Sequence, residues 1–179
     1  MEYSYGLKIP KDRIAVIIGK DGEIKTELEE LTKTHIDVDS KEGDVTITGK
    51  DSLSLFALKE VIRAIGRGFN PEIARLLLKQ DYVLEIIPLL DYIANKNHLE
   101  RIKGRVIGAG GKSRTTIENL TETFICVHGK TISIIGESEG VTNAKKAVES
   151  LIAGSPHANV YRWLEKSRRK IKEEEIKNW

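Results

Sequence analysis

The stretch Val16-Ile17-Ile18-Gly19-Lys20-Asp21-Gly22 places two glycines, separated by two residues, directly after an apolar run. The same arrangement returns later in the chain as Val106-Ile107-Gly108-Ala109-Gly110-Gly111, and a helical pattern follows each loop. Glycine has no side chain and adopts backbone conformations that other residues avoid, so such a loop lets another chain approach very closely. One loop of this kind would be weak evidence. Two at corresponding places in a repeat predict a binding loop that occurs twice.

The similarity between the two halves extends well beyond the loops. At an offset of 89 residues, eight positions correspond: Ile18, Gly19, Gly22, Leu28, Leu31, Thr32, Thr34 and Ile36 recur as Ile107, Gly108, Gly111, Ile117, Leu120, Thr121, Thr123 and Ile125. At an offset of 87, Val45, Ile47, Gly49, Ala57, Val61 and Ile65 recur as Ile132, Ile134, Gly136, Ala144, Val148 and Ile152. This period is longer than that of stacking repeats. It therefore predicts two copies of one small domain, residues 1–80 and 81–179.

Apolar periodicity predicts the same order in each copy, namely strand, helix, helix, strand, strand, helix. The expected elements of the first copy are 5–10, 11–18, 23–32, 35–39, 44–48 and 52–65. Those of the second copy are 82–87, 97–107, 112–122, 123–128, 131–136 and 138–153. One more helix follows each copy, at 71–79 and from residue 157 to about residue 177. The order predicts an α+β fold, with helices on one face of a three-stranded antiparallel sheet.

Composition places the chain among globular proteins, because 40% of its 179 residues are hydrophobic and 31% are charged. No apolar run approaches the length of a membrane span, and residues 1–5 lack the basic start of a signal peptide. A single cysteine, Cys126, excludes an intramolecular disulfide and fits a reducing compartment. We therefore expect a cytoplasmic protein.

Charge is distributed unevenly between the two copies. Residues 1–80 hold 13 Lys and Arg against 14 Asp and Glu, whereas residues 81–179 hold 16 against 13. The window 96–114 around the second loop has six basic residues against one acidic residue, a net charge of +5. The matching window 11–25 has four against three, a net charge of +1. Since Lys and Arg supply most of the affinity for phosphate, the second copy is expected to bind nucleic acid more strongly.

The two loops are typical of the KH domain, whose GxxG loop clamps the backbone of single-stranded RNA. In that arrangement the bases lie in an apolar groove between the flanking helices and the second strand. The expected RNA contacts of the first copy are Gly19, Lys20, Asp21, Gly22 and Lys25, with Ile18, Ile24 and Ile36 in the groove. Those of the second copy are Lys103, Arg105, Gly108, Ala109, Gly110, Gly111, Lys112, Ser113 and Arg114, with Ile107, Ile117 and Ile125 in the groove. The alternative interpretation makes the glycines ordinary helix caps and the isoleucines ordinary core.

The sequence gives little support for catalysis. Gly111-Lys112-Ser113 resembles the end of a phosphate-binding P-loop, but that motif needs a glycine at position 106, which is Val106. The four histidines are scattered, with no two at the spacing of metal ligands. We therefore expect no enzyme activity, no cofactor and no metal site.

The segment from Ile102 to Thr121 resembles the KH signature of the partner-of-Nob (Dim/Pno-type) ribosome assembly factors. Residues 154–161 are similar to the segment that follows it there, and residues 17–22 and 64–69 resemble the archaeal branch. The resemblance covers residues 6–165 and implies two type I KH domains. In eukaryotic relatives the first copy lacks its GxxG loop, whereas Gly19-Lys20-Asp21-Gly22 is intact here.

The resemblance implies a factor in small-subunit ribosome maturation that binds the 3′ end region of the small-subunit rRNA. The implied partners are the endonuclease that trims this rRNA and the α subunit of translation initiation factor two. An alternative is a KH module in RNA turnover or translation regulation. Subunits of RNA-degrading complexes usually join KH to an S1-type barrel, and no barrel pattern occurs here. A protein-interaction scaffold that no longer binds RNA is a third possibility, which the intact glycines disfavour.

Overall fold

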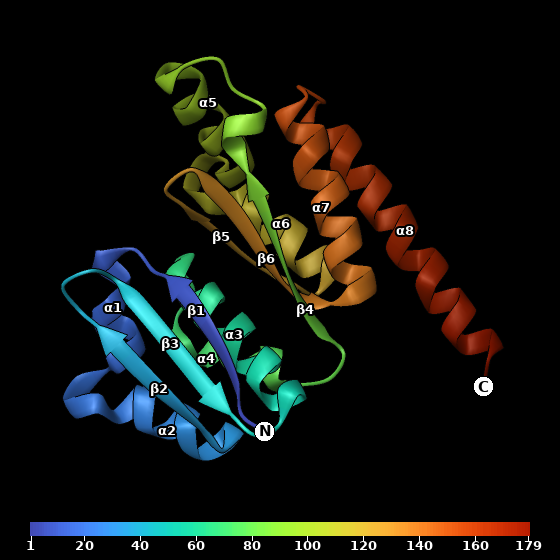
Figure 1. Cartoon of the computed structure of the whole chain (residues 1–179). Helices are drawn as coiled ribbons and strands as arrows, with labels where there is room; N and C mark the ends of the chain where they lie inside the picture. The colour runs from blue at the N-terminus through green and yellow to red at the C-terminus, as the bar shows by residue number, and fades with distance from the viewer. The chain divides into compact units, whose positions relative to one another are not determined.

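The computed structural model describes the whole chain, Met1–Trp179, and its contacts divide it into two compact units, Met1–Leu84 and Glu85–Trp179 (Figure 1). This boundary falls within β4 (Tyr82–Pro88), the strand that opens the second sheet and is described with the second unit, whereas the sequence places the domain boundary after residue 80. Each unit is built on its own three-stranded sheet. No helix in the chain combines the length and the apolar character needed to cross a membrane.

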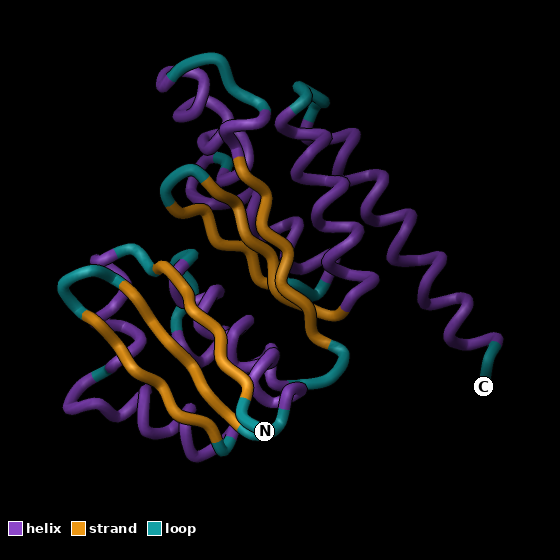
Figure 2. Tube along the Cα trace, viewed as in Figure 1, coloured by secondary structure: helices purple, strands orange, loops and turns teal.

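The first unit contains one sheet with its helices on one face (Figures 1 and 2). Its elements are β1 (Tyr3–Lys8), α1 (Lys11–Ile18), the 3-10 turn η1 (Lys20–Gly22), α2 (Glu23–Thr32), β2 (Thr34–Asp39), β3 (Asp44–Gly49), α3 (Ser52–Gly66), α4 (Pro71–Ala74) and η2 (Arg75–Leu78). The strand order is β1-β3-β2, and β3 pairs antiparallel with both neighbours. Val45 and Ile47 are fully buried whereas Asp44 and Thr46 are exposed, as alternation on a sheet covered on one face requires.

The second unit repeats this plan and adds a long helix. Its elements are β4 (Tyr82–Pro88), η3 (Leu89–Asp91), α5 (Lys96–Ile107), η4 (Ala109–Gly111), α6 (Lys112–Thr121), β5 (Phe124–His128), β6 (Thr131–Glu137), α7 (Ser138–Ile152) and α8 (His157–Lys177). The strand order is β4-β6-β5. Helix α8 packs on α6 and α7, and it buries Val160 and Leu164 against the core of the unit.

The predicted fold class is confirmed, since each unit has the element order of a type I KH domain followed by further helix. Most predicted ends lie within one residue of the observed ends, and two elements differ by more. The first strand is Tyr3–Lys8, because its ladder with β3 begins at Tyr3 opposite Gly49 and closes at Lys8 opposite Asp44. The helix predicted over 71–79 is one turn of α-helix, capped by the Asn70 side chain, that tightens into a 3-10 helix at Arg75.

Candidate nucleic-acid interface

The first glycine of each loop is required by the backbone and by its surroundings. Gly19 has φ 76° and ψ 178°, and Gly108 has φ 76° and ψ 170°. This region is accessible almost only to glycine. A Cβ on Gly19 would also lie 2.5 Å from Cγ1 of Ile24, and one on Gly108 would lie 2.7 Å from Cβ of Ser113. Helices α1 and α5 therefore end, and the chain turns sharply, only because these positions lack side chains.

The later loop positions are left-handed but open to their surroundings. Asp21 and Gly110 have φ 53° and 60°, and the last glycines, Gly22 and Gly111, have φ 77° and 75°. A Cβ on Gly22, Gly110 or Gly111 would meet nothing within 4 Å. The outer surface of each loop can therefore accept a closely approaching chain, directly beside the N-terminus of α2 or α6, where unpaired N–H groups favour anions.

The side chains on the two loops differ in charge and exposure. Lys20 and Asp21 are both exposed, so the first loop presents a cation beside an anion. Ala109, Gly110 and the following Lys112 are exposed, so the second loop presents no acid. Ser113, a predicted RNA contact, is only 1% exposed beneath Gly108, and its hydroxyl has no hydrogen-bond partner.

The predicted groove isoleucines fall into two groups. Ile36 and Ile117 are fully buried and Ile125 is 4% exposed, so these three side chains fill the cores of their units. Ile18, Ile24 and Ile107 are half-buried around the loops, so part of each apolar side chain remains exposed there.

The basic residues predicted as RNA contacts also differ in the groups that they contact within the protein. Lys25 lies 3.4 Å from a carboxylate oxygen of Glu29, and Lys103 lies 3.9 Å from Glu100. The guanidinium of Arg105 donates to the carbonyl of Leu151 at 3.0 Å and to that of Ser155 at 2.6 Å. Arg105 therefore satisfies carbonyls at the C-terminal end of α7, a structural role within the second unit.

The first unit has a matching arginine that the sequence did not single out. Arg13 donates to the carbonyls of Ile65 and Phe69, both at 2.8 Å, at the end of α3. At the repeat offset Arg13 corresponds to Ile102, and Arg105 corresponds to Val16. In each unit, therefore, an arginine from the helix before the glycine loop, α1 or α5, binds carbonyls at the end of α3 or α7, but the two arginines lie three positions apart in the repeat.

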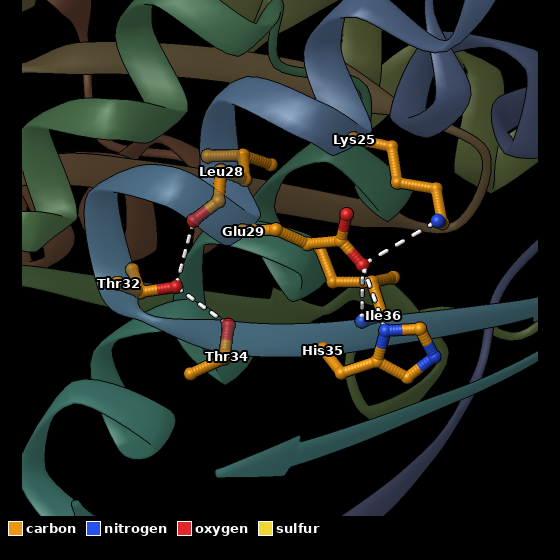
Figure 3. A network of polar contacts seen from close by, with 7 residues as sticks. All are labelled: Lys25, Leu28, Glu29, Thr32, Thr34, His35 and Ile36. Atoms are coloured by element: carbon orange, nitrogen blue, oxygen red, sulfur yellow. Dashed lines mark hydrogen bonds and ion pairs between the residues drawn. The ribbon is translucent and has the colours of Figure 1, made fainter.

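A polar network joins α2 to β2 in the first unit (Figure 3). Oε1 of Glu29 accepts a hydrogen bond from the backbone N–H of Ile36 at 2.8 Å, and it lies 3.2 Å from Nδ1 of His35. The Thr32 hydroxyl donates to the Leu28 carbonyl at 2.7 Å, so it must accept from the Thr34 hydroxyl at 2.6 Å. The network holds the second helix against the edge strand along the predicted groove.

The second unit contains the same network at corresponding positions. Oε2 of Glu118 accepts from the N–H of Ile125 at 2.9 Å, as Oε1 of Glu29 does from Ile36. The Thr121 hydroxyl donates to the Ile117 carbonyl and contacts the Thr123 hydroxyl, at 2.7 and 2.8 Å. The sequence pattern did not single out Glu29 and Glu118, although the offset of 89 that relates the two loops also relates these two residues.

Two side chains outside the loops have shifted pKa values. Hydrogen bonds from the side chain and the backbone of Ser54 lower the pKa of Asp51, which caps the N-terminus of α3. A hydrogen bond to Glu85 raises the pKa of Lys145 on α7. Both shifts have local structural causes. No group of three or more His, Cys, Asp or Glu side chains is arranged to hold a metal ion.

Two family profiles match the chain, one on each unit. Residues 4–64 match the KH domain, and residues 83–169 match a profile described as a eukaryotic-type KH domain of type I. A KH domain-containing protein of Methanocaldococcus jannaschii is 48% identical over 97% of this chain and 78% of its own length. The pre-rRNA-processing protein pno1 of Aspergillus fumigatus is 30% identical over 92% of this chain and 68% of its own length.

A solved structure is similar to this chain over most of its length. It is the aDim2p chain from the crystal structure of an a/eIF2alpha-aDim2p-rRNA complex of Pyrococcus horikoshii. The TM-score is 0.89 at 45% sequence identity, and the match covers 94% of this chain and 96% of that one.

Proposed function

The chain belongs to the Pno1/Dim2 family of tandem KH-domain proteins, and from this premise we propose that it binds single-stranded pre-rRNA during ribosome biogenesis. The observation that carries the proposal is the pair of loops with one backbone geometry, each open on its outer surface. A KH loop of this kind clamps the backbone of about four nucleotides. Two intact loops in one chain favour binding by both units.

The proposed contacts follow from exposure. The RNA backbone passes over Gly19–Gly22 and Gly108–Gly111, and the ammonium groups of Lys20 and Lys112 bind phosphates. The bases contact the half-buried isoleucines Ile18, Ile24 and Ile107. The remaining residues predicted at the site support or border it: Asp21, Lys25, Ile36, Lys103, Arg105, Ala109, Gly110, Ser113, Arg114, Ile117 and Ile125.

Names of relatives support a narrower version of the proposal. One relative is named a pre-rRNA-processing protein, and aDim2p was crystallised with a/eIF2alpha and rRNA. We propose the 3′ end region of the small-subunit rRNA as target, in the cytoplasm. The α subunit of translation initiation factor two and the endonuclease that processes this rRNA are the proposed protein partners. Titration of the chain with each purified partner tests this version, and absence of binding removes that partner.

The central test compares single-stranded with double-stranded RNA across a salt series. Binding should favour the single strand and weaken as salt rises, with a logarithmic slope of about −0.7 for each neutralised phosphate. Equal affinity for both forms, or no affinity for either, would refute the proposal.

We also propose that the chain acts by binding and not by catalysis. Purified protein incubated with RNA or ATP should release no product above background. A rate that a point substitution in the chain abolishes would show the opposite.

A further inference from the structure

The carboxylates of Glu29 and Glu118 occupy the same place in the two units, at the exposed edge of the second strand of each sheet. Strand β2 pairs with β3 on one side only, and β5 pairs with β6 on one side only. Ile36 stands opposite Ile47 in the ladder, yet its N–H donates to Glu29 rather than to β3. Antiparallel strands alternate between residues whose polar groups face the partner and residues whose polar groups face away. The N–H of Ile36 therefore faces the helix α2, and the carboxylate lies between helix and strand.

This space is the one in which the bases lie in the KH arrangement, so the carboxylates border the proposed RNA groove. The side chains of Glu29 and Glu118 are 20% and 22% exposed, so neither side chain is closed off from solvent. If these side chains only joined helix to strand, a charged group would not be needed, since a neutral amide oxygen accepts a hydrogen bond from the same backbone N–H.

The two carboxylates keep acceptor capacity that the chain does not use. All the drawn contacts of Glu29, from Lys25, His35 and the N–H of Ile36, end on Oε1 (Figure 3). In the second unit the N–H of Ile125 binds Oε2 of Glu118, whereas Oε1 lies 3.8 Å from Nε of Arg114, beyond hydrogen-bond distance. That Nε is buried and makes no hydrogen bond. Each unit therefore offers a carboxylate oxygen as acceptor beside a cationic donor.

We propose that Glu29 and Glu118 read the bases in the two grooves, favouring bases with an exocyclic amino group and rejecting uracil. This inference rests on the proposed RNA binding. A carboxylate only accepts hydrogen bonds, and it pairs well with amino groups such as N4 of cytosine. The single ring N–H of uracil is flanked by two carbonyl oxygens, which a carboxylate repels. Lys25 and the terminal guanidinium N–H groups of Arg114, rather than its buried Nε, then donate to the ring nitrogen beside the amino group.

Rings at corresponding positions support this geometry. The residue before the strand donor is His35 in the first unit and Phe124 in the second. Both residues are exposed: the His35 side chain is 70% exposed, and Phe124 as a whole residue is 38% exposed. Flat side chains of this kind stack on unpaired bases. In the first unit the His35 ring lies beside the carboxylate, with Nδ1 3.2 Å from Oε1 of Glu29, so a base held against that strand edge would have a ring beside it.

The test uses the full chain with both glutamates replaced, Glu29→Gln and Glu118→Gln. Glutamine keeps a carbonyl oxygen for the N–H of Ile36 and Ile125, so the strand edge stays fastened, but its amide can also donate to uracil. The matched control is Glu30→Gln with Glu137→Gln, since both glutamates are exposed and the change in net charge is the same. Amide exchange at Ile36 and Ile125 reports whether both variants keep the native strands.

Affinities are measured for oligonucleotides of about ten adenines, cytosines or uracils. The unaltered chain should bind the adenine and cytosine strands about tenfold more tightly than the uracil strand. The Glu29/Glu118 variant should lose most of this preference, while the control strengthens all three complexes alike. Equal binding of all three by the unaltered chain, or the same preference in both variants, overturns the inference and leaves RNA binding intact. Failure to bind any of the strands overturns the proposed function, and the inference with it.

Discussion

The two glycine loops share a backbone and differ in side chains. Corresponding φ angles agree within a few degrees, at 76° and 76° for the first glycines and 77° and 75° for the last. Between them the first unit carries Lys20-Asp21 and the second carries Ala109-Gly110. The shape of the proposed clamp therefore depends on the glycines alone, and its charge can vary independently. The comparison separates substitutions that break the fold of a loop from those that change only what it binds.

The largest expected effect concerns the shared backbone. Gly19→Ala or Gly108→Ala should lower the free energy of unfolding by about 4 kcal/mol, because strain at this φ and ψ adds to a clash with the next helix. Gly22→Ala and Gly111→Ala meet no neighbouring atom and should cost about 1 kcal/mol. Urea unfolding, with amide exchange to assign each change to a unit, measures the difference. Equal costs at the first and last glycines would contradict this account of the loop.

The next expected effect concerns the difference in charge between the two loops, which substitutions can remove. Ala109→Asp with Gly110→Asp, and separately Lys20→Asp, turn both loops into Gly-Asp-Asp-Gly. Asp21 already adopts φ 53°, so an aspartate at Gly110, with φ 60°, fits the backbone. The second-unit variant should lose about a hundredfold in affinity for single-stranded RNA and the first-unit variant about tenfold, because the second unit carries the more basic window. If the first-unit variant loses more while both remain folded, the apolar groove and not the charge sets affinity.

The sequence predicted these loops and the element order because both depend on local patterns, glycine spacing and apolar alternation. It could not separate Ile36, Ile117 and Ile125 from Ile18, Ile24 and Ile107, since a buried core and an apolar groove use the same residue type. Their exposure depends on packing between distant elements.

The sequence could not predict the long-range polar contacts either. A count of charges around the second loop included Arg105, but its acceptors lie 46 and 50 residues away in the sequence. Glu29 and Glu118 were overlooked for the related reason that their backbone partners are on the following strand. The offset of 89 relates this glutamate pair as it relates Thr32 to Thr121 and Thr34 to Thr123, but the offset alone does not show which backbone group each carboxylate binds.

The third prediction concerns Arg13 and Arg105, which donate hydrogen bonds to carbonyls at the ends of α3 and α7. Arg13→Met and Arg105→Met should each lower the free energy of unfolding by about 2 to 3 kcal/mol, since each removes two hydrogen bonds from a charged donor to partly buried carbonyls. If Arg105 acts in structure alone, Arg105→Met should leave the salt dependence of RNA binding unchanged once the protein is folded. A reduction in that slope by about 0.7 would return Arg105 to the RNA contacts.

The smallest expected effect concerns the threonine pairs that fasten helix to strand. Thr32→Val removes the acceptor of the Thr34 hydroxyl, which is half-buried and can turn to water, so the loss should be about 1 kcal/mol. Thr121→Val leaves the Thr123 hydroxyl without its partner at 4% exposure, and should cost about 1.5 kcal/mol. Urea unfolding of the two variants and of the double variants that also carry Thr34→Val or Thr123→Val measures these values. Replacing both members of a pair should restore part of the stability in the second unit, because no buried hydroxyl is then left unpaired, and little in the first. A larger cost for Thr32→Val than for Thr121→Val would mean that burial of the partner hydroxyl does not control the difference between the two units.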